Sequence, residues 1–132
     1  DLKTEDFDRM WTVNVRGVFL CSRAVLPHMI KQNSGVIVNI ASLAGKNSFV
    51  GGAGYAATKW ALRGFSQCMM LEVRQYNIRT VTVCPGSVDT DFSPKAKPRA
   101  LRAEDVADAV LFAVQFPERA MASEIDLRPT NP

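Results

Sequence analysis

The chain has 132 residues, of which 47% are hydrophobic and 22% are charged, and its formal net charge at pH 7 is +3. This size and composition are typical of one globular domain, or part of one, with a buried core. The basic residues are scattered without interleaved aromatics, and no apolar stretch reaches the ~18–20 residues that cross a bilayer, so neither nucleic-acid binding nor a membrane span is expected. The opening is mostly polar and begins at Asp1 without a methionine. It lacks a secretory signal and suggests a fragment or a processed chain.

The cysteines and the single histidine indicate neither a metal centre nor a hydrolase. Cys21, Cys68 and Cys84 are isolated, without the spacing of a Cys/His metal site. Each lies in an apolar run, so we expect buried, reduced thiols, which fit a cytoplasmic protein. His28 falls within a helical pattern beside Pro27, far from any candidate nucleophile. We therefore expect it to be a partly exposed helix residue.

Residues 5–31 carry apolar side chains at the spacing of one long helix. Thr4 can cap its start, and Glu5 and Asp6 complement the positive end of its dipole. Pro27 has no amide hydrogen, so it should kink or locally disturb this helix. Asn33, Ser34 and Gly35 then end it.

Strands and helices alternate after this point. The run 36–41 is almost continuously apolar and β-branched, as in a parallel strand covered on both faces. The elements predicted after it are a loop at 43–54, a helix at 54–75, a strand at 78–84, a loop at 85–101, a helix at 103–116 and a short strand at 123–128.

The predicted order α-β-α-β-α-β describes an α/β protein with a parallel sheet of about three strands. Such a thin sheet resembles the second half of a Rossmann-like doubly wound fold. A missing first half, or a partner chain, should therefore cover the open edge beside strand 36–41.

Three side chains form the candidate catalytic group. Tyr55 and Lys59 are four residues apart on the second helix, so they share one face. The Lys59 ammonium stabilises the phenolate form of Tyr55, which brings proton transfer by the phenol nearer to neutral pH. Ser42 follows the carboxyl end of a strand, where ligands of open α/β sheets bind, and can hydrogen-bond the same substrate oxygen. The group points to hydride transfer at a carbonyl or alcohol carbon, although a Tyr-x-x-x-Lys pair also occurs by chance on solvated helices.

Four motifs, in order, resemble the short-chain dehydrogenase/reductase family over almost the whole chain. Residues 35–42 are similar to the family's strand that leads to its catalytic serine, here Ser42. Residues 55–59 are similar to its Tyr-x-Ala-Ser-Lys box, with Thr58 where serine is commoner. Residues 85–90 match its Pro-Gly-x-Val-x-Thr loop, and Asn14 matches the helix asparagine of its catalytic tetrad.

The resemblance implies a role for each residue of the tetrad. Tyr55 would be the general acid in carbonyl reduction and the base in alcohol oxidation, while Ser42 would orient and stabilise the substrate oxygen. Lys59 would assist Tyr55 and hold the ribose of the nicotinamide. Asn14 would position a water that links Lys59 to solvent. Without the resemblance, Asn14 reads equally as an ordinary helix residue that bonds nearby backbone.

The same resemblance implies an NAD or NADP cofactor. Besides Tyr55 and Lys59, its binding residues would be Pro85, Gly86, Val88 and Thr90. The family's phosphate-binding loop and the residue that selects NAD or NADP precede its catalytic half, and neither is in this sequence. We therefore interpret residues 1–132 as a single partial domain, the catalytic half, and expect the chain alone to be weakly active or inactive.

Two alternatives stay open at this point. The chain could be a non-catalytic association module, since helices 5–31 and 54–75 are richer in apolar residues than one face against a sheet requires and resemble the family's dimerisation pair. A homodimer or homotetramer is expected on either interpretation. A sugar-nucleotide epimerase also shares Tyr-x-x-x-Lys, but the short carboxyl end disfavours it. The substrate is a small carbonyl or alcohol compound, and its candidate lining residues are Leu43, Phe49, Val50, Phe92, Lys95, Lys97 and Arg99.

Overall fold

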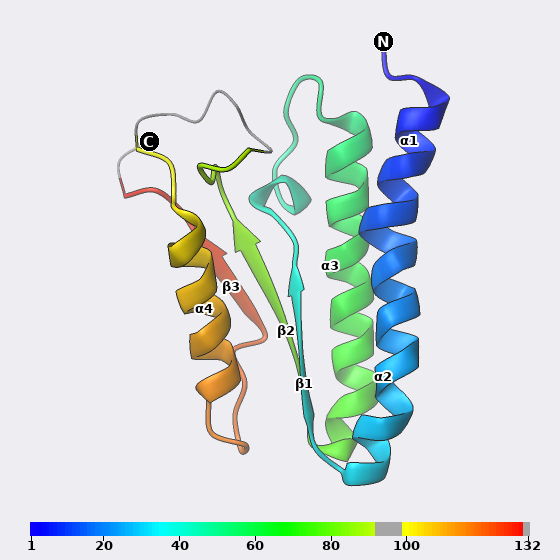
Figure 1. The fold of residues 1–132 in the computed structure, drawn as a ribbon, viewed down its shortest axis with the longest axis vertical. Coiled ribbons are helices and arrows are strands. Elements are labelled where there is room, and N and C mark those ends of the chain that lie inside the picture. Colours follow the sequence, from blue (N-terminus) through cyan, green and yellow to red (C-terminus); the bar gives the residue numbers. More distant parts are fainter. Residues whose placement is uncertain (92–98, 131–132) are drawn as a thin grey trace.

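A computed structural model describes residues 1–91 and 99–130 of the chain (Figure 1). The helices are α1 (Thr4–Trp11), α2 (Val18–Gln32), α3 (Ala53–Val73) and α4 (Ala103–Gln115). A π-helical turn (Thr12–Gly17) joins α1 to α2, and 3-10 turns occupy Leu43–Gly45 and Arg74–Tyr76. The strands are β1 (Gly35–Ile40), β2 (Ile78–Pro85) and β3 (Glu124–Leu127).

The three strands form one parallel sheet in the order β1-β2-β3. Gly35 pairs with Ile78 at the start of β1, and Thr82 pairs with Glu124 at the start of β3. The helices α3 and α4 connect the strands and lie on opposite sides of the sheet, so all three strands point toward the same end of the molecule (Figure 1). The predicted α/β class, strand number and doubly wound arrangement are therefore confirmed.

The core lies between α3 and the sheet. Six of the seven buried residues of α3 recur every three or four positions, which is the periodicity of one helix face: Gly54, Thr58, Leu62, Ser66, Met69 and Val73. The seventh is Ala56. This face packs on β2, which is buried along nearly its whole length. Met69, Val73 and Ile78 form one apolar cluster, and Ala41, Leu62 and Cys84 form another. The helix that carries Tyr55 and Lys59 is thereby fixed to the central strand.

The first predicted helix is found, but its irregularity is not at Pro27. Pro27 lies inside α2, and the helix continues through it to Gln32. Pro27 is exposed, so water can replace the hydrogen bond that its missing amide hydrogen would make. The regular hydrogen-bonding pattern changes instead at the π-helical turn 12–17, which carries Asn14.

The edge of β1 has no neighbouring strand within the described residues. Most of β1 is only partly buried, and Ile40 is 43% exposed. A groove of about 480 Å³ runs beside this edge between β1 and α2, lined mainly by apolar side chains that include Val13, Val18, Val25 and Val38. The open edge predicted from the sequence is thus present.

The cysteine prediction holds for one residue in three. Cys84 is buried on β2, but Cys21 and Cys68 are exposed. Both lie on long helices, where an apolar neighbourhood in the sequence does not decide which face a side chain occupies. His28 is exposed on α2, as expected. Among the described residues, no helix has both the length and the apolar character needed to cross a bilayer.

Candidate active site

The candidate catalytic residues gather where the strands end. Ser42 follows β1, Pro85 is the last residue of β2, and α3 begins at the same end of the sheet (Figure 1). In open α/β sheets this edge is where ligands bind, because the loops that follow parallel strands meet there.

The turn after β1 holds the Ser42 hydroxyl in place. Its Oγ accepts a hydrogen bond from the Ala44 amide at 3.0 Å and donates to the Pro85 carbonyl at 3.4 Å. The first bond caps the 3-10 turn, and the second joins the ends of β1 and β2. The turn also lies close to α3, since a Cβ added to Gly45 would stand 2.7 Å from the Lys59 carbonyl oxygen. Glycine is required here for that close approach.

Lys59 connects the end of β1 to the Tyr55 ring. Its Nζ donates to the Ile40 carbonyl at 3.0 Å and lies 5.6 Å from the centre of the Tyr55 ring. Burial lowers the pKa of Lys59, and the nearby Cys84 only partly offsets this effect. The amine is thus partly buried beside the Tyr55 ring, where its charge is screened less than in bulk water.

Asn14 reaches the same helix from the π-helical turn. Its Nδ2 donates to Thr58 Oγ1 at 3.0 Å, and that hydroxyl donates to the Tyr55 carbonyl at 2.8 Å. Thr58 is completely buried, so threonine preserves the hydroxyl that serine would supply at this position. Single π-helical turns often occur at functional sites because they re-aim one side chain. The structure thus connects Asn14 to α3 beside Tyr55 and Lys59.

The loop after β2 borders this group. Pro85 is buried, and the Gly86 amide donates to the Leu127 carbonyl at 2.9 Å. Val88 is partly buried and pairs with Leu101, whereas Thr90 is exposed. The proposed cofactor residues therefore divide into a fixed part at Pro85 and Gly86 and a more exposed part toward Thr90. Of the candidate substrate residues, Phe92, Lys95 and Lys97 lie outside the described residues.

Sequence reasoning missed an ion-pair network that lies beside the site. Arg63 Nε lies 2.9 Å from Glu124 Oε2, and Arg63 NH1 donates to the Gly45 carbonyl at 2.7 Å. Lys46 contacts both Glu124 and Asp126 at 2.5 Å. The network therefore ties the turn after Ser42 to both α3 and β3. The sequence held one signal of this network: Glu124 and Asp126 are two residues apart in a strand, so their side chains lie on the same face of β3.

The charges in this network alter one another's ionisation. Burial alone would raise the pKa of Glu124, but hydrogen bonds from Arg63 and Lys46 outweigh it and lower the pKa. The hydrogen bond to Glu124 is the largest effect on Arg63 and raises its pKa. Burial alone would lower the pKa of Lys46, yet its bonds to Asp126 and Glu124 raise it overall.

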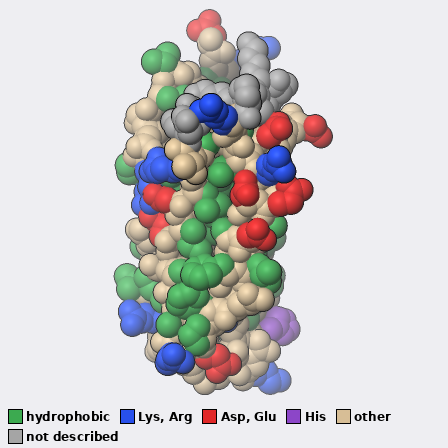
Figure 2. Space-filling view, turned by 90° about the vertical axis from the view of Figure 1, so that its left-hand side faces the viewer, with side chains coloured by type: hydrophobic (Ala, Val, Ile, Leu, Met, Phe, Trp, Pro, Cys, Tyr) green, Lys and Arg blue, Asp and Glu red, His purple; other side chains and the backbone are tan. Residues whose placement is uncertain are grey.

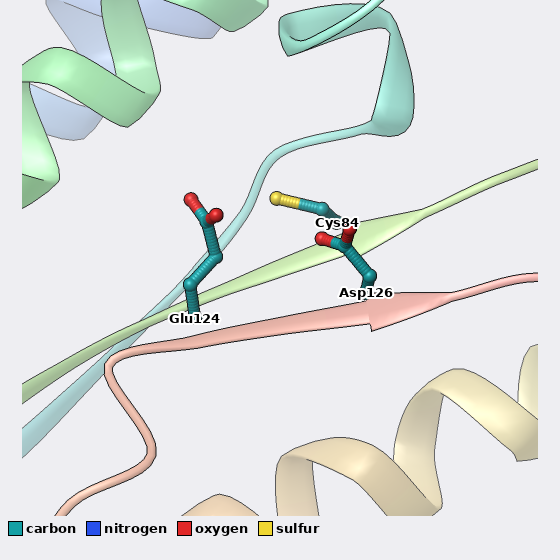
Figure 3. Close-up of side chains that lie close together, drawn as sticks. All are labelled: Cys84, Glu124 and Asp126. Atoms are coloured by element: carbon teal, nitrogen blue, oxygen red, sulfur yellow. The ribbon is translucent and has the colours of Figure 1, made fainter.

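The same carboxylates approach the Cys84 thiol (Figure 3). The ligand atoms of Cys84, Glu124 and Asp126 lie within 4.8 Å of one another, which is compatible with a metal ion. Both carboxylates already contact Lys46, and Arg63 also contacts Glu124. Burial raises the pKa of the Cys84 thiol, which disfavours the thiolate that binds metals. We therefore interpret the cluster as part of the ion-pair network.

Comparison with known proteins identifies the family of the chain. The model of the short chain dehydrogenase family matches residues 1–100. An uncharacterised oxidoreductase of Staphylococcus epidermidis is 34% identical, and the match covers 98% of this chain and 57% of the relative. The chain thus spans little more than half the length of this relative.

Solved structures share the fold. The closed form of a serine dehydrogenase complexed with NADP⁺ superposes with a TM-score of 0.92 at 28% identity, covering 100% of this chain and 59% of that one. A 3-ketoacyl-(acyl-carrier-protein) reductase from Brucella melitensis complexed with NADH gives a TM-score of 0.90 at 26% identity, covering 98% and 59%. The family match over most of the sequence and the agreement in fold lead to one conclusion: the chain belongs to the short chain dehydrogenase family.

Proposed function

We propose that this chain is the catalytic half of an NAD(P)-dependent oxidoreductase that interconverts a carbonyl and an alcohol. One observation carries the proposal: Lys59 bonds the end of β1 two residues before Ser42 while also facing the Tyr55 ring. A hydroxyl, a phenol and an ammonium on two adjacent elements are the groups needed to hold an oxygen and move a proton to it.

In reduction, the Tyr55 phenol gives its proton to the substrate oxygen as negative charge develops there. The Ser42 hydroxyl exchanges its 3.4 Å bond to the Pro85 carbonyl for a hydrogen bond to the same oxygen, and the Ala44 amide continues to hold the hydroxyl oxygen in place. The Lys59 ammonium stabilises the phenolate that remains. In oxidation the same groups act in reverse, so Tyr55 takes the proton of the alcohol.

The residues present fit a nicotinamide. Lys59 offers an ammonium for ribose hydroxyls, and Pro85 and Gly86 form a fixed surface beside Ser42. Val88 and Thr90 would continue that surface. When bound, the nicotinamide supplies or accepts the hydride. The two cofactor-bound relatives carry NADP⁺ in one case and NADH in the other, so the choice between them is open for this protein.

We further propose that residues 1–132 form one partial domain whose phosphate-binding half belongs to a longer parent protein. Two findings support this division: the edge of β1 has no neighbouring strand among the described residues, and the match covers little more than half of each relative. A cytoplasmic location is consistent with free cysteines at positions 21, 68 and 84.

The test compares the parent protein with the isolated chain. Both are assayed for oxidation of NADH and NADPH with a panel of small aldehydes and ketones. We expect turnover by the parent and little by the isolated chain. Substantial turnover by the isolated chain would show that the division into halves is wrong.

Tyr55→Phe in the parent tests the catalytic assignment. Loss of a general acid should lower kcat about 10²–10⁴-fold. Tyr76→Phe is the matched control, because Tyr76 lies in the 3-10 turn at the opposite end of α3. A parent that shows no turnover with either cofactor, or a Tyr55→Phe variant as active as the control, would contradict the proposal.

The alternative of an association module is favoured by a different observation. Exposed apolar side chains lie along the first helical segment (residues 4–32, from α1 through α2) and along α3. They include Val13, Phe19, Trp60 and Leu71. We propose that this surface forms a homodimer or homotetramer, either as part of the enzyme or, in the alternative, as the chain's whole function.

Sedimentation of the chain at micromolar concentration tests the association surface. Leu71→Asp should shift a dimer to monomer, because a charge would be desolvated in the interface. Leu111→Asp on α4 is the control, because Leu111 is similarly exposed on the other side of the sheet. If the unsubstituted chain sediments as a monomer, this surface is not sufficient to hold two copies together.

A further inference from the structure

A second cavity adjoins the candidate catalytic group and shares Gly86 with the surface proposed above for the nicotinamide. It has a volume of about 310 Å³ and lies between Leu43, Gly86, Ser87, Arg99, Ala100, Arg128 and Pro129. A volume of this size accepts a small organic molecule. Its walls come from three separate segments: the turn after β1, the loop after β2 and the segment after β3.

Position connects the cavity to the reaction. Leu43 directly follows Ser42, and Gly86 directly follows Pro85, whose carbonyl accepts the Ser42 hydrogen bond. Gly86 is itself fixed by its bond to the Leu127 carbonyl. A short molecule with its oxygen at Ser42 would therefore extend its other end toward the cavity.

The cavity wall carries excess positive charge. Within the described residues Arg99 makes no ion pair, and Arg128 contacts only Asp126, at 3.5 Å. Asp126 is already shared with Lys46. Asp89 and Asp91, the nearby acids of the described loop, are exposed and pair with neither arginine. Two guanidinium groups thus remain available to an anion.

The other residues that line the cavity restrict the kind of chemical group to which the anion is attached. Leu43, Ala100 and Pro129 give apolar walls, which suit a short carbon chain. Guanidinium groups match the planar geometry of carboxylates and can form paired, charge-assisted hydrogen bonds with them. An apolar chain that ends in a carboxylate satisfies both parts of the wall.

We propose that this cavity is a carboxylate subsite, and that the protein acts on small oxo acids or hydroxy acids whose carboxylate is held by Arg99 and Arg128. The proposal rests on the proposed oxidoreductase function for its reaction. The binding of the carboxylate itself can be measured without any reaction.

The first test is a titration of the isolated chain with 3-hydroxybutyrate, observed by NMR at the backbone amides of Gly86, Ser87 and Arg128. The neutral analogue 1,3-butanediol is titrated in parallel. We expect saturable shifts at these amides with the carboxylate and none with the diol. Equal shifts with both compounds, or none with either, would overturn the proposal.

Substitutions then assign the charge. Arg99→Gln and Arg128→Gln should each weaken carboxylate binding about tenfold, which is the effect of losing one charge-assisted hydrogen bond. Arg119→Gln is the control, because Arg119 is exposed beyond the opposite end of α4. Nicotinamide mononucleotide is a competitor in the same titration. If it produces the same shifts and displaces 3-hydroxybutyrate, the cavity belongs to the cofactor and the carboxylate subsite is wrong.

Kinetics of the parent protein separate this inference from the proposed function. With 3-oxobutyrate and its methyl ester as substrates, Arg128→Gln should raise KM for the acid about tenfold and leave kcat and the ester unaffected. Equal kcat/KM for acid and ester would refute the subsite while leaving the oxidoreductase function intact. Absence of all turnover would refute that function, and the titration would still decide the subsite.

Discussion

The two faces of the sheet are built differently. On one side, α3 buries Leu62, Met69 and Val73 against β2 and is itself partly covered by the first helical segment. On the other side α4 is the one helix among the described residues, and its buried residues are two alanines, Ala109 and Ala113. Figure 2 shows hydrophobic side chains gathered along the α4 side, where Leu111, Phe112 and Val114 are exposed.

The proposed catalytic residues lie on α3 or are held against it. Tyr55 and Lys59 are on α3, Asn14 contacts α3 through Thr58, and the Arg63 network fixes the Ser42 turn to α3. Catalytic geometry requires side chains held within narrow limits, and buried, hydrogen-bonded elements provide this. The α4 side contributes no residue of the proposed tetrad.

The largest expected effect is on activity, and it tests whether the α3 side carries the reaction. Ser42→Ala in the parent removes a hydrogen-bond donor to the substrate oxygen and should lower kcat about 10²–10³-fold. Ser48→Ala, in the exposed loop before α3, should leave kcat unchanged. Steady-state kinetics decide the matter, and similar kcat values for the two variants would exclude Ser42 from the chemistry.

The next largest effect should be on stability, because substitutions on the two faces of the sheet should change the free energy of unfolding by different amounts. Leu62 is 2% exposed on α3, whereas Leu111 is 52% exposed on α4. Leu62→Ala should lower the free energy of unfolding by about 2–5 kcal/mol, and Leu111→Ala by less than about 0.5 kcal/mol. Urea denaturation of the chain measures both. Equal losses would mean that the faces do not differ energetically.

The ion-pair network should contribute less than the apolar core. Glu124→Gln keeps the shape of the side chain but removes the charge that Arg63 and Lys46 share. The free energy of unfolding should fall by about 1–3 kcal/mol, because Arg63 loses its carboxylate partner and Lys46 loses one of its two. Glu118→Gln, at an exposed position after α4, is the matched control. No difference between the variants in urea denaturation would show that the network is energetically neutral.

Acid should produce the smallest effect. The loss of unfolding free energy caused by protonation of Glu124 should be no larger than the loss caused by Glu124→Gln. The pKa of Glu124 is lowered in the folded chain, so its contribution is complete above the unfolded value of about 4.3 and is lost as pH falls through the folded pKa. The difference in unfolding free energy between wild type and Glu124→Gln should therefore begin to narrow below about pH 4 and continue to narrow as the pH falls through the folded pKa. Denaturation at pH 7 and at pH 3 checks this, and a constant difference would exclude Glu124 as the titrating group.

The sequence predicted the elements well because periodicity and turn residues are local signals. Each strand and helix was located to within about two residues. Ser42 was thereby placed after the end of a strand, and Tyr55 and Lys59 on the helix that follows it. The π-helical turn at 12–17 was missed, because Pro27 was the only local signal of irregularity and the change in hydrogen bonding depends on packing against α3. The Arg63 and Lys46 network was missed for a similar reason. Its residues are separated by up to 80 positions, and only tertiary structure brings them together.

The free edge of β1 affects how the chain can be handled. Lysine, proline and charged residues on an edge strand normally prevent strands of different molecules from pairing. Residues 35–40 contain none of them. No strand in the described part of the chain pairs with the backbone groups of this edge, so they and the apolar groove beside them form a template for a further strand. A segment that supplies such a strand would both complete the sheet and keep the chain in solution. Without one, concentrated samples should aggregate by β-pairing along this edge, and a charged residue on its solvent side would be the remedy.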